Sequence, residues 1–367
     1  MNPTTTADQT LAQLSNWLIY SAIAVYLLAF LAHCAEWAFG SRSRIVRLSA
    51  ATDTGPAART AAENRTSPFA RAAASTAVLT RPADTEKTAG TSGPPGPAPA
   101  ADDPDAADSD PRSDLLGRIG VSLATLAFLL HLASVVTRAW SVSRPPWGNM
   151  YEFSTAFALA ATGTYLGLLA ARKQVRWLGL PVTFSVLLTL GLAVTVLYVE
   201  SAQLVPALDS YWLWIHVSAA IISGGAFHTA AVATLLYLAR ARWEAAVADG
   251  RGQGRFAALW RRLPAAERLD TLSYRLNALV FPLWTFSVIA GAVWAEAAWG
   301  RYWGWDPKET WAFITWVAYA AYLHARVTAG WKGRRAAYLG LIAFATFVFN
   351  YYGVNIFITG LHSYAGI

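Results

Sequence analysis

The sequence has 367 residues, of which 55% are hydrophobic, 13% are aromatic and only 14% are charged. This composition, with a mean hydropathy of +0.34, excludes a soluble globule and is typical of a polytopic membrane protein. The formal net charge of +7 does not indicate nucleic-acid binding, because the arginines gather in short connections between apolar segments, where membrane topology explains them.

The one cysteine of the sequence is Cys34, which lies inside the first apolar segment. The chain therefore has no internal disulfide, no CxxC redox pair and no cysteine-based zinc site. It cannot itself reduce the thiols of a substrate by dithiol exchange.

About eight segments approach the ~20 apolar residues that a helix needs to cross a bilayer core. In chain order they are residues 17–39, 117–139, 150–171, 175–198, 211–238, 278–297, 308–328 and 337–359. All are predicted to be helices, since only an internally hydrogen-bonded backbone is tolerated in lipid. The expected fold class is thus an all-α polytopic membrane protein with about eight transmembrane helices. The first segment follows an N-terminus without a basic region and is expected to remain as an uncleaved anchor.

The connections between these segments differ in charge. The first, third, fifth and seventh carry most of the Arg and Lys residues, and the others are poor in charge or acidic. Because positive loops remain on the cytoplasmic side of a membrane, the basic connections are predicted to be cytoplasmic. Both termini and the connection after the sixth segment are then expected to lie outside.

Three regions are predicted along the chain. Residues 1–39 form an N-terminal transmembrane helix, and residues 117–367 form a seven-helix membrane domain. Between them, residues 40–116 are rich in Ala, Pro, Thr, Ser and Asp and lack apolar periodicity, which is typical of a disordered linker, here cytoplasmic. Residues 240–275 are expected to form one or two short amphipathic helices along the inner surface.

The connection after the sixth segment reads WGRYWGWDPKETW over residues 299–311, with four tryptophans in thirteen residues. Scattered tryptophans are typical of a membrane interface. This density, with glycines that permit close approach, favours a stacking platform for a flat hydrophobic ligand. Asp306, Pro307 and Glu309 also have the spacing of a capping box that begins the next helix, and the two interpretations are compatible.

The string AWGRYWGWDPKETWAFITW, residues 298–316, resembles the tryptophan-rich WWD signature of the cytochrome c assembly family. Its DPKETW ending resembles the CcsA/ResC branch of that family, which belongs to System II cytochrome c biogenesis. The segment SRPPWGNMYEF also resembles an external segment of the family, for which we expect only structural support of the site.

This resemblance implies a haem-handling protein of the bacterial plasma (inner) membrane, with haem b as cofactor and an active site on the external face. It implies a CcsB/ResB-type membrane subunit, apocytochrome c and a thiol-reducing thioredoxin-like protein as partners. The residues expected to contact the cofactor are Trp299, Arg301, Trp303, Trp305, Asp306 and Trp311.

Histidine is the usual ligand of haem iron, and two imidazoles give a closed six-coordinate site. His216 and His362 fall at the external ends of their segments, and the resemblance implies that they are the axial ligands of an external haem. His324 lies 17 residues after Pro307, roughly 26 Å down a helix and near the inner boundary of the membrane. It resembles the transmembrane haem histidine of the family, whose opposite ligand comes from the partner subunit.

The other histidines match no family motif and are expected either in the core or as supports of the ligating residues; they are His33, His131 and His228. Haem propionates are anionic and need cations or hydrogen-bond donors on the external side. Ordinary interface anchoring is an equal alternative for each of the cations available there, which are Arg138, Arg144, Arg301 and Lys308.

The predicted function is that of a haem-handling subunit of a cytochrome c synthase, which moves haem across the membrane and presents it for thioether attachment to a CxxCH segment. By the resemblance, synthesis belongs to the pair with the CcsB/ResB-type subunit. One alternative is a haem transporter or chaperone that delivers haem without attaching it. A channel or ion transporter is a second alternative, against which the spans carry few carboxylates.

Overall fold

The structure is a computed structural model that describes residues 8–53, 111–203, 210–252 and 257–362. The chain divides into two compact units, one of residues 1–37 with 115–367 and one of residues 38–114. Everything below on packing and on the site concerns the larger unit.

The described residues are helical, with no strand among them, which confirms the all-α fold class. In chain order the longer helices are α1 (Gln9–Asp53), α4 (Pro111–Val142), α5 (Met150–Ala170), α6 (Gly179–Thr195), α7 (Tyr211–Ala248), α9 (Ala266–Trp299), α10 (Pro307–Val327) and α11 (Arg334–Val348). A short 3₁₀ turn, Arg176–Leu178, precedes α6. A π-helical turn, Phe349–Gly353, continues α11 into α12 (Val354–Phe357).

Each predicted apolar segment coincides with one of these helices. Within the described residues, seven helices are long and apolar enough to cross a membrane. The helix outside this set is α10, whose 21 residues include Lys308, Glu309, His324 and Arg326, which lower its hydropathy. Its length of about 31 Å matches a bilayer core. The protein is therefore a multi-pass membrane protein.

The boundaries of the predicted linker differ from the structure. Helix α1 continues to Asp53 and α4 begins at Pro111, so both ends of the predicted linker are helical. The rest of that segment lies outside the described residues.

The predicted surface helices of residues 240–275 also differ. Helix α7 extends to Ala248, α9 begins at Ala266, and the short α8 (Ala257–Trp260) lies between them. Leu263, Ala266 and Leu269 are buried in a cluster with Tyr237 of α7. This stretch therefore packs against the bundle through the ends of two long helices.

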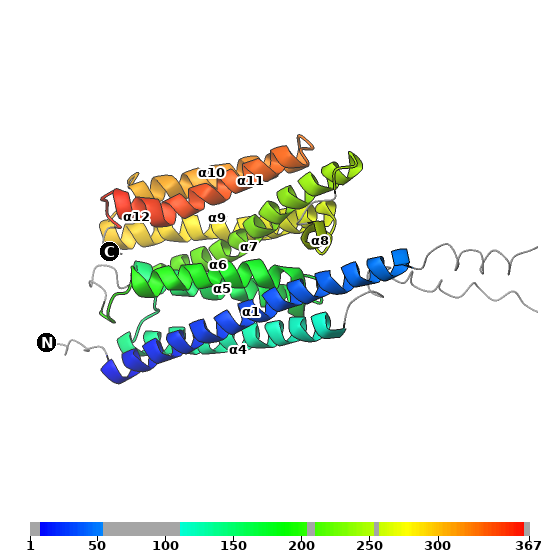
Figure 1. Cartoon of the computed structure of the whole chain (residues 1–367). Helices are drawn as coiled ribbons and strands as arrows, with labels where there is room; N and C mark the ends of the chain where they lie inside the picture. Colours follow the sequence, from blue (N-terminus) through cyan, green and yellow to red (C-terminus); the bar gives the residue numbers. More distant parts are fainter. Residues whose placement is uncertain (1–7, 54–110, 204–209, 253–256, 363–367) are drawn as a thin grey trace, which may run out of the picture. The chain divides into compact units, whose positions relative to one another are not determined.

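Helix α7 is the inner helix of the bundle, since 78% of its apolar window is buried. Its small residues make this possible. A Cβ added to Gly225 would lie 2.6 Å from the backbone carbon of Ala160, so only glycine lets α5 and α7 approach this closely. Figure 1 shows the long helices running side by side, with the start of α1, α12 and the α9–α10 connection at the same end.

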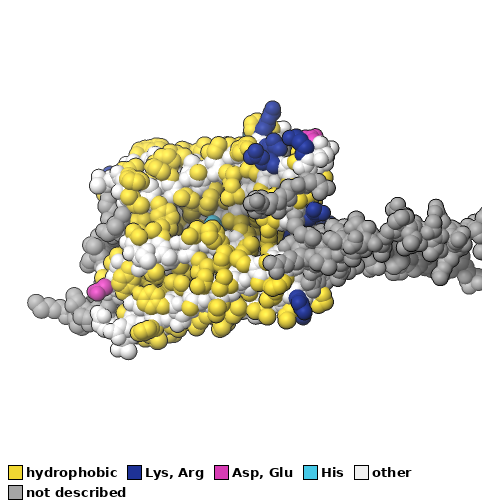
Figure 2. All heavy atoms as spheres, in the orientation of Figure 1, with side chains coloured by type: hydrophobic (Ala, Val, Ile, Leu, Met, Phe, Trp, Pro, Cys, Tyr) yellow, Lys and Arg dark blue, Asp and Glu magenta, His cyan; other side chains and the backbone are white. Residues whose placement is uncertain are grey.

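Charge is unevenly placed on the surface. Figure 2 shows one face covered by hydrophobic side chains, with its Lys and Arg residues mostly at the end opposite the α9–α10 connection. Basic ends of membrane proteins face the cytoplasm. The prediction that the tryptophan-rich connection lies outside agrees with this distribution of charge.

Candidate functional site

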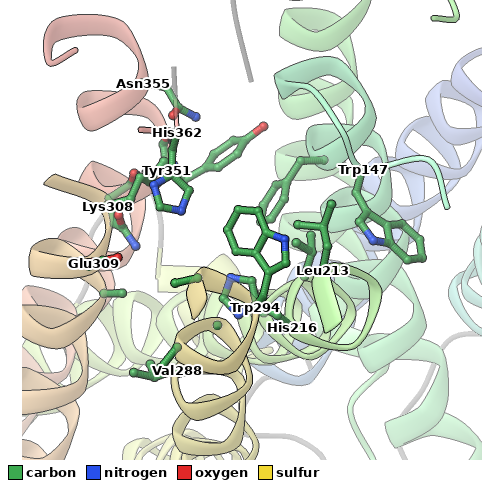
Figure 3. A pocket seen from close by; sticks show the side chains of 18 of the residues that line it. Trp147, Leu213, His216, Val288, Trp294, Lys308, Glu309, Tyr351, Asn355 and His362 are labelled. Atoms are coloured by element: carbon green, nitrogen blue, oxygen red, sulfur yellow. Dashed lines mark hydrogen bonds between the residues drawn. The ribbon is translucent and has the colours of Figure 1, made fainter. Parts of the chain in front are cut away.

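A cavity opens at the end of the bundle where α7 begins, α9 ends and α10 begins (Figure 3). It contains about 1130 Å³ of empty space when the open solvent at its mouth is included. Its wall comes from α5 and the residues before it, from α7, α9, α10 and the π-helical turn, and from His362 near the end of the described chain. His216 and His362 thus share one cavity.

His216 is fixed by α9. Its Nδ1 donates to the backbone carbonyl of Ser287 at 2.7 Å, and the Ser287 hydroxyl donates to the His216 carbonyl at 3.0 Å. A Cβ on Gly291 would lie 2.7 Å from the ring, so glycine is needed where the imidazole contacts α9. Because Nδ1 carries the proton, Nε2 is the nitrogen with a lone pair for a ligand.

His362 is fixed by Asp306. Its Nδ1 donates to Oδ2 of Asp306 at 2.7 Å, and the Leu361 N–H donates to Oδ1 at 2.6 Å. A Cβ on Gly360 would lie 2.6 Å from Oδ1, so glycine also permits this approach. Burial raises the pKa of Asp306, but the hydrogen bonds from His362 and Leu361 outweigh it and hold the pKa below its ordinary value. A carboxylate bonded to Nδ1 fixes the tautomer of His362, with the proton on Nδ1.

The start of α10 has the predicted capping box. Asp306 accepts from the Lys308 N–H at 3.1 Å, and Glu309 accepts from the Asp306 N–H at 3.1 Å and from the Gly304 N–H at 2.8 Å. Asp306 therefore begins the helix and positions His362 at the same time. The structural and functional interpretations of this residue apply together.

Trp294 of α9 packs against both histidines (Figure 3). Its ring is parallel to that of His216, with centroids 6.2 Å apart and an interplanar angle of 8°, and its centroid is 5.6 Å from that of His362. It is only 1% exposed. The sequence analysis missed Trp294, although its place at the external end of an apolar span, five residues before Trp299, was a signal that could have found it.

The predicted tryptophans separate into two groups. Trp299 and Trp303 line the cavity, and Trp299 meets the His362 ring edge to face at 5.0 Å. Trp305 is 66% exposed, has a left-handed backbone with φ +57°, and is not part of the cavity wall. Trp311 packs on Phe349, at 4.2 Å between centroids, and also lies outside the wall.

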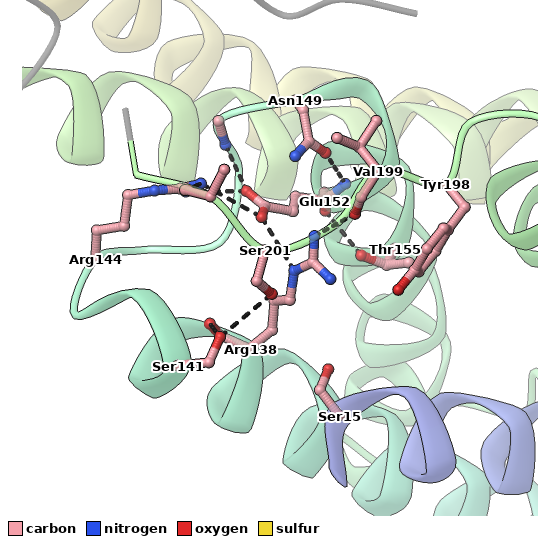
Figure 4. A network of polar contacts seen from close by, with 12 residues as sticks. Ser15, Arg138, Ser141, Arg144, Asn149, Glu152, Thr155, Tyr198, Val199 and Ser201 are labelled. Atoms are coloured by element: carbon pink, nitrogen blue, oxygen red, sulfur yellow. Dashed lines mark hydrogen bonds and ion pairs between the residues drawn. The ribbon is translucent and has the colours of Figure 1, made fainter. Parts of the chain in front are cut away.

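The cations considered for the haem propionates also differ in their position relative to the cavity. Arg301 is exposed and lies over Gly304, outside the cavity wall. Arg138 and Arg144 both bind the buried carboxylate of Glu152, at 3.1 and 3.0 Å (Figure 4). Lys308 does line the cavity.

The network in Figure 4 supports the wall formed by residues 147–150. The Gly148 N–H donates to Glu152 at 2.9 Å, and Asn149 caps α5 by accepting from the Glu152 N–H at 2.8 Å. The guanidinium of Arg138 also donates to the Val199 carbonyl at 2.6 Å. The structural role expected for this segment is therefore played by a buried charge cluster that holds one side of the cavity.

The remaining histidines do not line the cavity. His324 is exposed in the last turn of α10, far along that helix from Asp306. His33 and His131 are fully buried, and His228 packs between Phe157 and Phe344. The three sit in the core, where the sequence analysis expected them.

Comparison with known proteins shows which family has this sequence and architecture. The family model described as "Cytochrome C assembly protein" matches residues 147–362. The cytochrome c biogenesis protein CcsA of Gloeobacter violaceus is 35% identical over 299 residues, covering 69% of this chain and 88% of its own length. CcsA of Parasynechococcus marenigrum is 38% identical over 260 residues, covering 66% of this chain and 85% of its own length.

Among solved structures, that of the cytochrome c haem lyase CcmF matches with a TM-score of 0.55 and 16% identity. The match covers 94% of this chain but 47% of CcmF, so the chain spans about half of that structure, and the likeness concerns the fold. The extent and identity of the CcsA matches, together with the family model, show that this chain belongs to the CcsA family of cytochrome c biogenesis proteins.

Proposed function

We propose that this protein is the haem-handling subunit of a cytochrome c synthase, with an external haem b site between His216 and His362. The observation that carries the proposal is the cavity whose wall contains both histidines, each with its Nδ1 bonded to a fixed acceptor. Among the described residues, no three His, Cys, Asp or Glu side chains gather as a site for a bare metal ion. Two imidazoles alone are the ligand set that suits an iron already held by a porphyrin.

The walls of the cavity also fit a porphyrin. Trp294, Trp299 and Trp303 supply aromatic faces, and much of the rest of the wall is apolar. These residues would hold the haem and exclude water from it. When bound, haem supplies two vinyl groups, and each cysteine thiol of a CxxCH segment adds across one of them, sulfur to one carbon and hydrogen to the other, so no oxidant is consumed. The chain's own residues supply position and electrostatics.

A second haem site is proposed at His324, on the cytoplasmic side of the membrane domain. Its side chain is exposed on the described chain, so a partner helix can contribute the opposite ligand. The expected partner is a CcsB/ResB-type subunit. A thioredoxin-like protein is expected to keep the apocytochrome thiols reduced, since the single cysteine of this chain cannot do so. The complex is placed in the bacterial plasma membrane, with attachment on the external face.

The axial assignment is tested by the visible spectrum of the detergent-purified protein coexpressed with its partner. In His216→Gly and His362→Gly the reduced haem bands are expected to be lost or weakened, and added imidazole should restore them. His228→Gly is the matched control, because His228 lies on the same helix as His216 but outside the cavity. Wild-type haem content in both site variants would show that the axial assignment of His216 and His362 is wrong.

A second experiment distinguishes a synthase, which attaches haem, from a protein that only delivers haem. The protein is coexpressed with its partner and a CxxCH reporter, and covalent haem is detected on the reporter after denaturing electrophoresis. A reporter with serines in place of both cysteines is the control. A complex that contains haem but never labels the CxxCH reporter would be a haem transporter and not a synthase.

A further inference from the structure

Lys308 is the one lysine or arginine among the described residues that line the cavity. It is the second residue of α10, directly after the capping residues, so the helix start fixes its backbone. Its side chain is half-buried and extends toward the π-helical turn. The cavity wall, otherwise mainly apolar and aromatic, therefore contains one basic side chain among the described residues.

The π-helical turn provides the contacts of the ammonium group. Lys308 Nζ donates to the carbonyl of Asn350 at 2.9 Å and lies 3.5 Å from that of Tyr351. It is also 5.4 Å from the centre of the Tyr351 ring. A π-helical turn displaces the regular helical ladder, which leaves carbonyl groups able to accept other bonds, and such turns are frequent at functional sites.

The hydrogen bonds of the Lys308 ammonium group go to the neutral carbonyl groups of Asn350 and Tyr351. Among the described residues, no carboxylate forms an ion pair with its ammonium group. Asp306 is bonded to His362, the Leu361 N–H and the Lys308 N–H, and Glu309 is held toward the loop by two backbone N–H groups. A partly buried ammonium group whose hydrogen bonds go to neutral carbonyls gains stabilisation from a bound anion.

We propose that Lys308 is the anion-binding group of the cavity and binds a carboxylate of the ligand, which is a haem propionate. This inference rests on the proposed function. The other predicted cations are excluded by their positions, since Arg138 and Arg144 are bound to Glu152 and Arg301 lies outside the wall. An ammonium group at the start of α10 would hold the propionate edge of a bound porphyrin toward that helix.

The test compares haem with haem dimethyl ester, in which both propionates are masked. The purified full-length chain in detergent is titrated with each porphyrin, and the Soret band gives the affinity. The wild type is expected to prefer the free acid about tenfold or more, because a hydrogen bond to a charged group is worth ~1.5–3 kcal/mol. Lys308→Met should lose this preference while its affinity for the ester stays close to that of the wild type.

Two further variants sharpen the comparison. Lys308→Arg should retain a preference for the free acid, because it keeps the charge, and Arg301→Met should behave as the wild type. If Lys308→Met is not recovered in folded form, Lys308→Gln replaces it, since glutamine removes the charge but still offers a donor to Asn350.

Several outcomes would overturn the inference. A wild type that binds haem and its ester equally has no propionate subsite. A Lys308→Met variant that weakens both porphyrins equally shows that Lys308 only braces α10 against the π-helical turn. Failure of the wild type to bind either porphyrin would overturn the proposed function together with this inference, whereas the first two results leave the haem site in place.

Discussion

Replacing Asp306 with asparagine keeps the shape of the side chain but removes the charge that binds His362. Asp306 accepts from the His362 ring at 2.7 Å and from the Leu361 N–H at 2.6 Å. Asparagine has one carbonyl oxygen, so one of these donors must face the amide nitrogen. The lost bond to a charged acceptor is worth ~1.5–3 kcal/mol, and loss of the partner of a ligating histidine typically weakens metal affinity about 10–100-fold. We expect a loss in haem affinity of that order.

The assay is haem affinity by Soret titration, with thermal stability measured on the same preparations. Asp270→Asn is the matched control. Asp270 pairs with Arg326 at 2.8 Å near the opposite end of the same helices, so its replacement should lower thermal stability and leave haem affinity unchanged.

A different result would show that Asp306 acts only as a helix cap. Loss of the cap costs about 1 kcal/mol of helix stability. If Asp306→Asn binds haem as tightly as the wild type and only Asp306→Ala is impaired, the proposed coupling between the capping box and His362 is wrong.

Three other variants probe the cavity and its support. Gly291→Ala should reduce haem content, because the new Cβ would lie 2.7 Å from the imidazole of His216. Gly191→Ala is the control, since its Cβ would have no atom within 4 Å and haem content should not change. Pyridine haemochrome assays measure the haem content of both variants. Trp299→Ala should weaken haem binding more than Trp305→Ala, since only the first lines the cavity, and equal losses in Soret titrations would contradict this. Glu152→Ala leaves two buried guanidinium groups unpaired and should cost ~3–5 kcal/mol, seen as a large fall in melting temperature; an unchanged melting temperature would refute the buried-cluster argument.

The helices were predictable because the bilayer leaves an apolar segment no other regular structure. Every predicted segment coincides with a helix, although the ends differ where packing extends the helix, as at Ala248 of α7. Hydropathy predicts which residues can lie in the lipid core, but it does not predict how far a helix continues beyond the membrane. Helix α10 was also predicted as an apolar segment, but with charged residues in both end turns it falls outside the seven helices of the described chain that are apolar enough to cross a membrane by hydropathy.

The sequence by itself determined the class of protein and the capping box, because these depend on composition and local spacing. The resemblance of its motifs to a known family indicated the family and the pair His216 and His362. Only the tertiary structure decided that Trp299 and Trp303 line the cavity while Trp305 does not, that Trp294 packs against both histidines, and that Lys308 is the cation in the cavity wall. Which side of a helix or loop faces a cavity depends on contacts between segments distant in sequence. Those contacts are set by close approaches such as those that Gly291 and Gly360 permit, and no local pattern encodes them.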